Sequence, residues 1–134
     1  MIIRPGLDAG ASTERRSDTF SGEVFAHPVV SAAEVKIASV LFTPCARTYW
    51  HHHEHGQILY VTAGIGRICT AGETPRLIRA GDVVWVPPGE VHWHGAGPDS
   101  FMNHLAVSLG STSWADEVAE SDYTATPVQP TYPE

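Results

Sequence analysis

Four of the eight histidines in this 134-residue chain lie within five positions, inside the segment 49–64, which reads YWHHHEHGQILYVTAG. In a β-strand, residues two apart project to the same face, so His51 and His53 point together while His52 points away. The turn residues that follow would bring Gln57 back beside the two imidazoles. Two imidazole nitrogens and an amide oxygen are donors that suit a transition metal. The spacing therefore predicts a metal site.

A further donor is expected in the segment 81–95, GDVVWVPPGEVHWHG, which reads as a turn, a short strand and a second turn. His92 comes three residues after Gly89. A histidine that leaves a rigid Pro-Gly turn is held in place, as a ligand must be. The expected metal ligands are therefore His51, His53, Gln57 and His92.

Short apolar runs must position these side chains. Runs rich in Val, Ile, Phe, Trp and Tyr alternate with turn residues from position 22 onward, which is typical of an all-β sandwich or barrel. The later segment STSWADEVAESDY predicts one short helix with Ser113 as its N-cap. We therefore divide the chain into an N-terminal arm (1–21), a barrel (22–110), and a short helix with an extended tail (111–134).

Composition excludes several classes of partner. The formal net charge is −7 and only eight Lys and Arg residues are present, which disfavours nucleic acid and anionic membranes. No segment approaches the roughly 18 consecutive apolar residues of a membrane span, and the N-terminal segment lacks the apolar core of a secretion signal. We therefore expect a cytoplasmic protein, without membrane or nucleic-acid partners, whose Cys45 and Cys69 remain reduced.

The histidine-rich segment resembles the first motif of the cupin superfamily, small β-barrels that carry a metal near one mouth. That motif reads G-x5-H-x-H-x3,4-E-x6-G, and here it matches at His51, His53 and Gly64. Two positions depart from it. Cys45 replaces a turn glycine, and Gln57 replaces the usual glutamate, which removes a negative charge from the ligand set.

The second cupin motif, G-x5-P-x-G-x2-H-x3-N, matches at Gly81, Pro87, Gly89 and His92, with Ala96 in the Asn position. The resemblance implies a jelly-roll-like cupin barrel that binds one divalent transition metal per chain. Because the three histidines and the glutamine are neutral, the ion would keep its full double charge and act as a stronger Lewis acid than with a glutamate ligand.

The segment FMNHLAVSL offers a general base next to this metal. In a strand, His104, Ala106 and Ser108 share a face, and a neutral imidazole beside a metal site is a competent base. Ala38 and Val40 on an earlier strand are similarly small, which leaves room for a small substrate.

Other roles for His104 stay open. It is alternatively a core histidine bonded to a backbone carbonyl, or a fourth histidine ligand with Gln57 outside the metal site. His94, two residues after His92, is expected to be a supporting or packing residue. The opposite face of the last strand carries Leu105 and Val107, which need cover, and cupins often associate. We therefore expect a homodimer or a higher homo-oligomer.

Within the superfamily, the stretches ARTYWHHHEHGQILYVTAG, GDVVWVPPGEVHWHGA and HLAVS resemble small bacterial manganese cupins with hydroxynitrile lyase activity. The resemblance implies a metal site at His51, His53, Gln57 and His92, a catalytic His104, and pocket residues Ala38 and Val40. The pocket glutamine of that group falls on Ser108, a shorter side chain, which bears on substrate choice.

These features favour a metal-dependent lyase that acts on small hydroxy or carbonyl compounds. Manganese is the favoured metal, and iron, nickel, cobalt or zinc would also suit His and Gln donors. Two other functions remain open: a cupin-type dioxygenase, because such a site also admits O₂, and a non-catalytic small-molecule-binding cupin.

Overall fold

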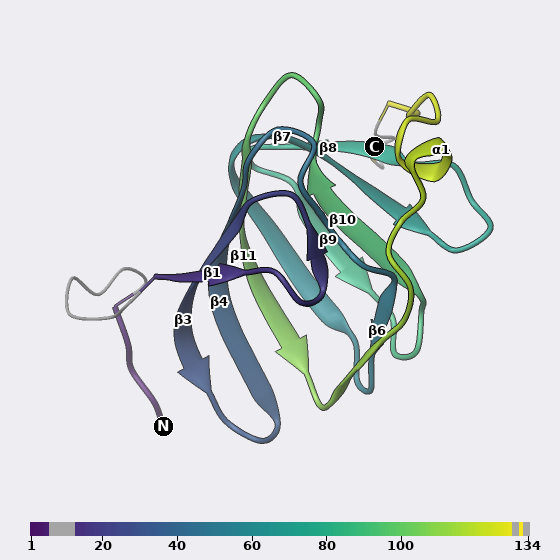
Figure 1. The fold of residues 1–134 in the computed structure, drawn as a ribbon. Coiled ribbons are helices and arrows are strands. Elements are labelled where there is room, and N and C mark those ends of the chain that lie inside the picture. Colours follow the sequence, from purple (N-terminus) through teal and green to yellow (C-terminus); the bar gives the residue numbers. More distant parts are fainter. Residues whose placement is uncertain (6–12, 130–131, 133–134) are drawn as a thin grey trace.

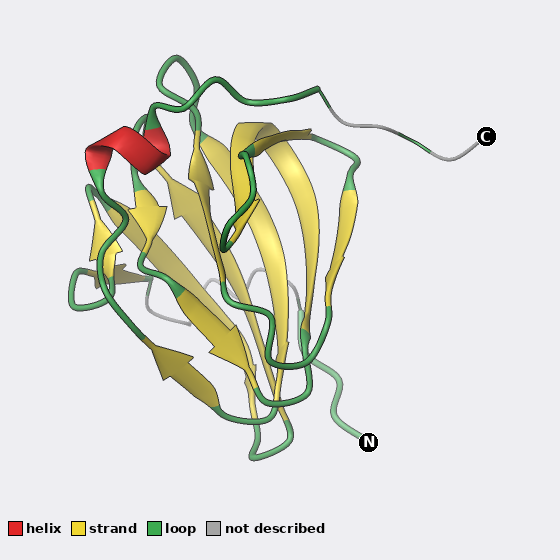
Figure 2. Ribbon diagram, turned by 90° about the vertical axis from the view of Figure 1, so that its right-hand side faces the viewer, coloured by secondary structure: helices red, strands yellow, loops and turns green. Residues whose placement is uncertain are grey.

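The alternation of apolar and turn residues gives rise to strands throughout the barrel segment. The computed structural model describes residues 1–5, 13–129 and 132, and within them it shows two facing sheets that form a nearly closed barrel (Figures 1 and 2). The strands are β1 (Glu14–Arg16), β2 (Phe20–Ser21), β3 (Val24–Ser31), β4 (Val35–Phe42), β5 (Arg47–Thr48), β6 (His51–His53), β7 (Gln57–Thr70), β8 (Arg76–Arg79), β9 (Val83–Val86), β10 (His92–Ala96), β11 (Met102–Leu109) and β12 (Thr112–Trp114). The expected all-β cupin-like barrel is confirmed.

Every pairing between named strands is antiparallel within the described residues. The first sheet has the order β1-β3-β4-β11-β7-β9, and the second sheet contains β2, β5, β10, β7 and β8, with β6 and β12 attached through β10. The apolar core lies between the sheets and includes Val24, Phe42, Leu59, Val61 and Met102. One strand, β7, belongs to both sheets.

The corner of β7 explains the last glycine of the first motif. Residues 57–64 of this strand run along β11, and residues 65–70 pair with β8 or β10 in the other sheet. Gly64 is the last residue of the first part and has a φ of 80°. A Cβ atom there would lie 2.0 Å from the carbonyl oxygen of Phe101, so only glycine fits. This corner sets how the two sheets face each other.

Cys45 adopts a left-handed conformation, with a φ of 70°, and it is the only non-glycine residue in the described ranges to have a positive φ. The cupin motif has glycine at this position, because glycine adopts a positive φ without the steric cost that a Cβ atom brings. The thiols of Cys45, which is exposed, and Cys69, which is buried, are both free.

The variant Cys45→Gly is therefore expected to be more stable than the parent protein. Relief of the left-handed strain is worth about 1–2 kcal/mol, and the added freedom of glycine in the unfolded chain offsets up to about 1 kcal/mol of that gain. Urea unfolding of the two proteins under reducing conditions would measure the difference. A lower midpoint for the glycine variant would contradict this account.

The two ends of the chain differ in detail from the sequence expectation. The segment expected as an arm contributes β1, paired with β3, and β2, paired with β5, so it bridges the two sheets. The helix α1 covers only Glu120–Tyr123. Ser113 as its N-cap was wrong, because Ser113 lies in β12 opposite His52. Within the described residues, no helix has the length and apolar character needed to cross a membrane.

Candidate metal centre and cavity

The three histidines predicted as ligands come together in the second sheet. His51 and His53 are the ends of β6, and His92 is the first residue of β10, directly opposite His51 in the antiparallel register. One ring nitrogen from each histidine lies within 4.8 Å of the other two. All three side chains are buried. The spacing of two residues in β6 thus puts both imidazoles on the same face of the sheet as His92.

Hydrogen bonds to the backbone orient two of these rings. Nδ1 of His51 donates to the Tyr49 carbonyl at 2.8 Å, and Nδ1 of His92 donates to the Glu90 carbonyl at 2.9 Å. A neutral imidazole carries one proton, so these bonds leave the lone pair on Nε2. Fixing a metal-ligating histidine through its other nitrogen is the usual arrangement in metal sites.

His53 is oriented by a residue that the sequence analysis missed. Its Nδ1 lies 2.9 Å from Oγ1 of Thr112 in β12, and its Nε2 is buried without a hydrogen-bond partner among the described residues. Trp114, on the same strand, covers His51 with ring centroids 4.6 Å apart. The alternation of Thr112 and Trp114 after the turn at Gly110 was the signal for a strand here.

Gln57 completes the cluster. Its Nε2 donates to Ser108 Oγ at 3.0 Å, and its Oε1 lies 2.9 Å from Nε2 of His92. Nδ1 of His92 already donates to a carbonyl, so Nε2 of this neutral ring carries a lone pair. Gln57 Oε1 and His92 Nε2 therefore face each other with lone pairs. Two acceptors that face each other are stabilised by a cation that binds both. With the unpartnered Nε2 of His53, this arrangement fits a divalent ion.

Burial keeps these imidazoles uncharged. It is the largest factor that lowers the pKa of His53 to about 4, and it also lowers the pKa values of His51 and His92. Neighbouring histidines add to the shift for His51 and His53. The rings therefore have free lone pairs at neutral pH, which metal binding requires.

A cavity of about 690 Å³ lies between the sheets beside this cluster. Its wall includes His51, His53 and Gln57, whereas His92 borders a second cavity of about 630 Å³ whose lining includes residues of β8 and β9. The remaining predicted site residues all line the first cavity: Ala38, Val40, His104 and Ser108. The side chains of β4 and β11 alternate between the cavity and the outer face, as the period of a strand requires.

The side chain of His104 faces that of His94. Nε2 of His104 lies 2.9 Å from Nδ1 of His94, and both rings are buried and line the cavity. The other ring nitrogens, Nδ1 of His104 and Nε2 of His94, have no hydrogen-bond partner among the described residues. Burial lowers the pKa of His104 to about 4, and burial together with the neighbouring histidines lowers the pKa of His94 well below its usual value.

The pairing has a consequence for proton transfer. Two neutral rings that share one hydrogen bond leave one free lone pair and one free N–H, whichever ring donates. The pair of His94 and His104 therefore offers a proton acceptor and a proton donor in the same cavity wall. His94 was expected to be a supporting or packing residue, and its ring contacts that of His104.

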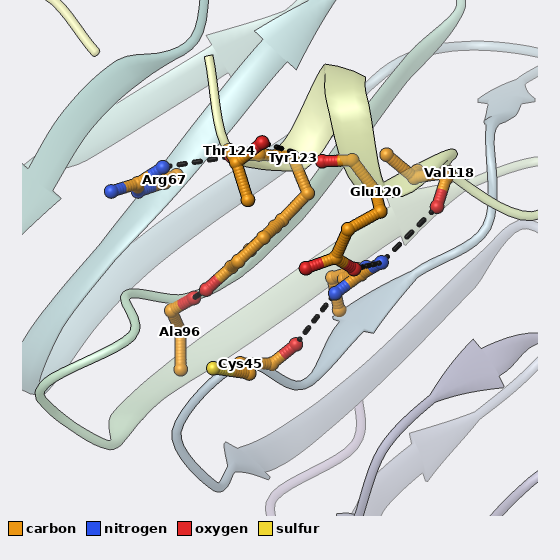
Figure 3. Close-up of polar contacts among 8 residues, drawn as sticks. Cys45, Arg67, Ala96, Val118, Glu120, Tyr123 and Thr124 are labelled. Atoms are coloured by element: carbon orange, nitrogen blue, oxygen red, sulfur yellow. Dashed lines mark hydrogen bonds and ion pairs between the residues drawn. The ribbon is translucent and has the colours of Figure 1, made fainter. Parts of the chain in front are cut away.

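Polar contacts hold the C-terminal segment against the second sheet, as Figure 3 shows. The Tyr123 hydroxyl donates to the Ala96 carbonyl at 2.6 Å, and Arg67 donates to the Tyr123 carbonyl at 2.7 Å. The Arg47 guanidinium lies 4.3 Å from the centroid of the Tyr123 ring and donates to the Val118 carbonyl. This clamp fixes the chain that follows β12, and therefore helps to place the strand that orients His53.

The variant Thr112→Val is expected to bind metal about 10- to 100-fold more weakly, because it keeps the shape of the side chain but removes the acceptor for His53 Nδ1. Thr112→Ser, which keeps the hydroxyl, serves as the matched control. Competition against a chromogenic chelator would measure both affinities. Equal affinities for the valine and serine variants would contradict the role given to the hydroxyl.

Comparisons with known proteins agree with this architecture. A family model described as a cupin domain matches residues 39–102. A protein from Granulicella tundricola described as (R)-mandelonitrile lyase is 42% identical over 120 residues, which make up 84% of this chain and 92% of that protein. The crystal structure of a cupin-like protein from Thermotoga maritima is 39% identical, with a TM-score of 0.78, over 84% of this chain and 90% of that one.

A more distant solved structure shares the fold alone. The polyketide cyclase RemF from Streptomyces resistomycificus is 18% identical with a TM-score of 0.71, and the match covers 92% of this chain and 91% of that chain. The barrel and both motifs agree with the family model, and one relative is 42% identical over 92% of its own length. The chain therefore belongs to the cupin superfamily.

Proposed function

We propose that this cupin is a manganese-dependent lyase that cleaves a C–C bond in small hydroxy compounds of the cyanohydrin type. One observation carries the proposal: an uncharged cluster of candidate metal donors borders, through His51, His53 and Gln57, the same cavity as the His94–His104 pair. The 42% identity to a protein described as (R)-mandelonitrile lyase supports this choice of reaction.

The metal donors of the proposal are His51, His53, Gln57 and His92. A divalent ion held by them would supply Lewis acidity, which stabilises negative charge as it develops on a substrate oxygen. The all-neutral donor set leaves that acidity undiminished. Manganese is proposed from the resemblance to manganese cupins, since the donor types alone admit several metals.

His104 is the proposed catalytic base. It takes the proton from the substrate hydroxyl while the C–C bond breaks, the oxygen electrons form the carbonyl, and the electron pair of the broken bond leaves with cyanide. The proton then passes to cyanide, so the products are an aldehyde and hydrogen cyanide. The low pKa of His104 keeps its ring unprotonated and ready to act at neutral pH. His94 holds the ring of His104 through the bond at 2.9 Å.

Small side chains shape the space for the substrate. Ala38, Val40 and Ala106 line the cavity near His104, and none carries a group that competes for protons. Ser108 is tied to Gln57 Nε2, so its hydroxyl can also donate to a substrate without losing that contact. We propose these residues as the pocket that holds a small hydroxy compound.

The test of this function starts from natively purified protein. Elemental analysis would identify the bound metal, and chelation followed by reconstitution with Mn, Fe, Co, Ni or Zn would give matched samples for a mandelonitrile cleavage assay. We expect activity to follow manganese content and to be independent of O₂. Equal rates in stripped and reconstituted protein would reject the proposal, and metal-dependent O₂ uptake would favour the dioxygenase instead.

We also propose that the protein forms a homodimer through the outer face of the first sheet. Ile58 and Tyr60 of β7 lie opposite Trp85 and Val83 of β9, and all four are exposed, with Val83 at 68% and Trp85 at 54%. Half-buried apolar residues of β11 continue this face. A contiguous apolar patch on a sheet favours association, and a second copy offers the same patch in return.

Sedimentation of a Trp85→Glu variant would test this interface. We expect the parent protein to sediment as a dimer and the variant as a monomer, because a buried unpaired carboxylate is costly. Ile65→Glu changes an exposed apolar residue outside the patch and serves as the control. A monomeric parent protein, or a dimeric Trp85→Glu variant, would contradict this interface.

A further inference from the structure

Lys36, the only lysine of the chain, lines the cavity. It belongs to a row of three residues on adjacent strands, together with Ser108 and Gln57. The antiparallel register puts Ser108 of β11 opposite both Gln57 of β7 and Lys36 of β4. Gln57 donates to Ser108, and Lys36, like its row neighbours, borders the cavity. The ammonium group therefore belongs to the wall of the site and not to an unrelated part of the surface.

The buried and half-buried part of the cavity wall, called its inner end here, contains no charged side chain among the described residues that line it. Its polar groups are uncharged hydroxyls, an amide and imidazoles, among them Thr48, His51, His53, Gln57, His94, His104, Ser108 and Thr112. A divalent cation held among these donors would keep both of its charges. Because an unbalanced buried charge is costly, such a cavity favours a ligand that brings negative charge with it.

The mouth of the cavity has a charge pattern that differs from that of the protein as a whole. The chain carries a net charge of −7. The charged residues that line the cavity are three cations and two anions: Glu14, Arg15, Arg16, Asp18 and Lys36. Arg16 pairs with Glu14 at 2.9 Å, and Arg15 pairs with Glu23 at 3.7 Å. Lys36 forms no ion pair with any residue that the structure describes.

We propose that the physiological substrate is a small hydroxy- or oxo-carboxylate, whose carboxylate pairs with Lys36 while its other oxygen faces the histidine cluster. This inference rests on the site assigned under the proposed function, and it gives that site a physiological substrate other than a simple cyanohydrin. Neighbouring strands are about 4.8 Å apart, so Lys36 and Gln57 are separated by about 10 Å at their Cα atoms. The flexible four-carbon stem of lysine covers part of that gap, and a short acid spans the remainder. A neutral nitrile would leave the ammonium without a partner.

A matched pair of ligands tests the charge requirement without relying on turnover. Mandelate and mandelamide have the same hydroxyl and ring, and differ only in the charge of the acyl group. Calorimetric titration of the manganese-loaded protein with each ligand would give the two affinities. We expect mandelate to bind more tightly than mandelamide. We expect Lys36→Met to weaken mandelate binding by about two- to tenfold, the range of a partly screened ion pair, and to leave mandelamide binding unchanged.

Two control variants separate the pairing from a general change of net charge. Lys36→Arg keeps the cation and should retain the preference for mandelate. Arg79→Met removes an exposed cation that does not line the cavity and should change neither affinity. The inference is overturned if mandelate binds no more tightly than mandelamide, if Lys36→Met affects both ligands equally, or if Arg79→Met has the same effect as Lys36→Met. None of these results depends on whether the protein cleaves cyanohydrins.

A second measurement needs no variant. Because the chain has one lysine, side-chain acetylation detected by mass spectrometry reports on Lys36 alone. We expect saturating mandelate to slow acetylation of Lys36 in the metal-loaded protein, whereas mandelamide at equal occupancy leaves the rate unchanged. Equal protection by the two ligands would show that Lys36 is merely covered and would contradict the ion pair.

Discussion

The variant His104→Ala should lose about 10²- to 10⁴-fold in lyase turnover, the contribution of a general base, while it retains its metal. The ring of His104 is buried, lines the cavity and is paired with His94, and it is not among the three clustered histidines that could hold a metal. Mandelonitrile cleavage measured beside the metal content of the same sample would separate loss of the base from loss of the ion.

The control for this variant is His55→Ala, which removes an exposed imidazole in the turn between β6 and β7. It should behave as the parent protein does. His104→Gln adds a further comparison, because the amide keeps a polar contact toward His94 but cannot accept a proton at neutral pH. Full activity in either His104 variant would remove the base from the mechanism.

The second large effect concerns the metal itself. In the parent protein, a metal at about 100 times its Kd would add about 2.7 kcal/mol to the free energy of unfolding. For a chain of this size that gain corresponds to a rise in Tm on the order of 10 °C. His53→Ala removes a buried nitrogen that has no partner among the described residues, so it should abolish this rise together with the activity.

Differential scanning calorimetry with and without added manganese would measure the effect, and His52→Ala provides the matched control. His52 lies on the same strand but points away from the cluster, so its variant should retain the full metal-dependent rise in Tm. A metal-dependent rise of equal size in His53→Ala and in the parent protein would place the ion elsewhere.

The strand period and the two motifs predict much of this structure. The spacing of His51 and His53 requires one face of a strand, and the turns before Gln57 and His92 return those residues to the same place. The inward positions of His104 and Ser108 follow from the same alternation. In each case local geometry decides the outcome, because a strand has one period and each glycine turn allows few conformations.

The support around the ligands could not be predicted in the same way. The segment after residue 110 has polar and acidic residues that favour a helix start, yet residues 112–114 pair with β6. Tertiary pairing overrides local preference there. The bond from Thr112 to His53 joins residues 59 positions apart, and no local pattern encodes it. The contact between His94 and His104 likewise depends on how the two sheets face each other, which a strand period does not specify.

The position of β12 also has a consequence for biosynthesis. The strands that carry His51, His53 and His92 emerge from the ribosome before Thr112 does. Until β12 has been made, His53 lacks its hydrogen-bond acceptor and the ring of Trp114 does not cover His51. A nascent chain that lacks β12 would therefore hold an ion at this site less tightly than the finished chain.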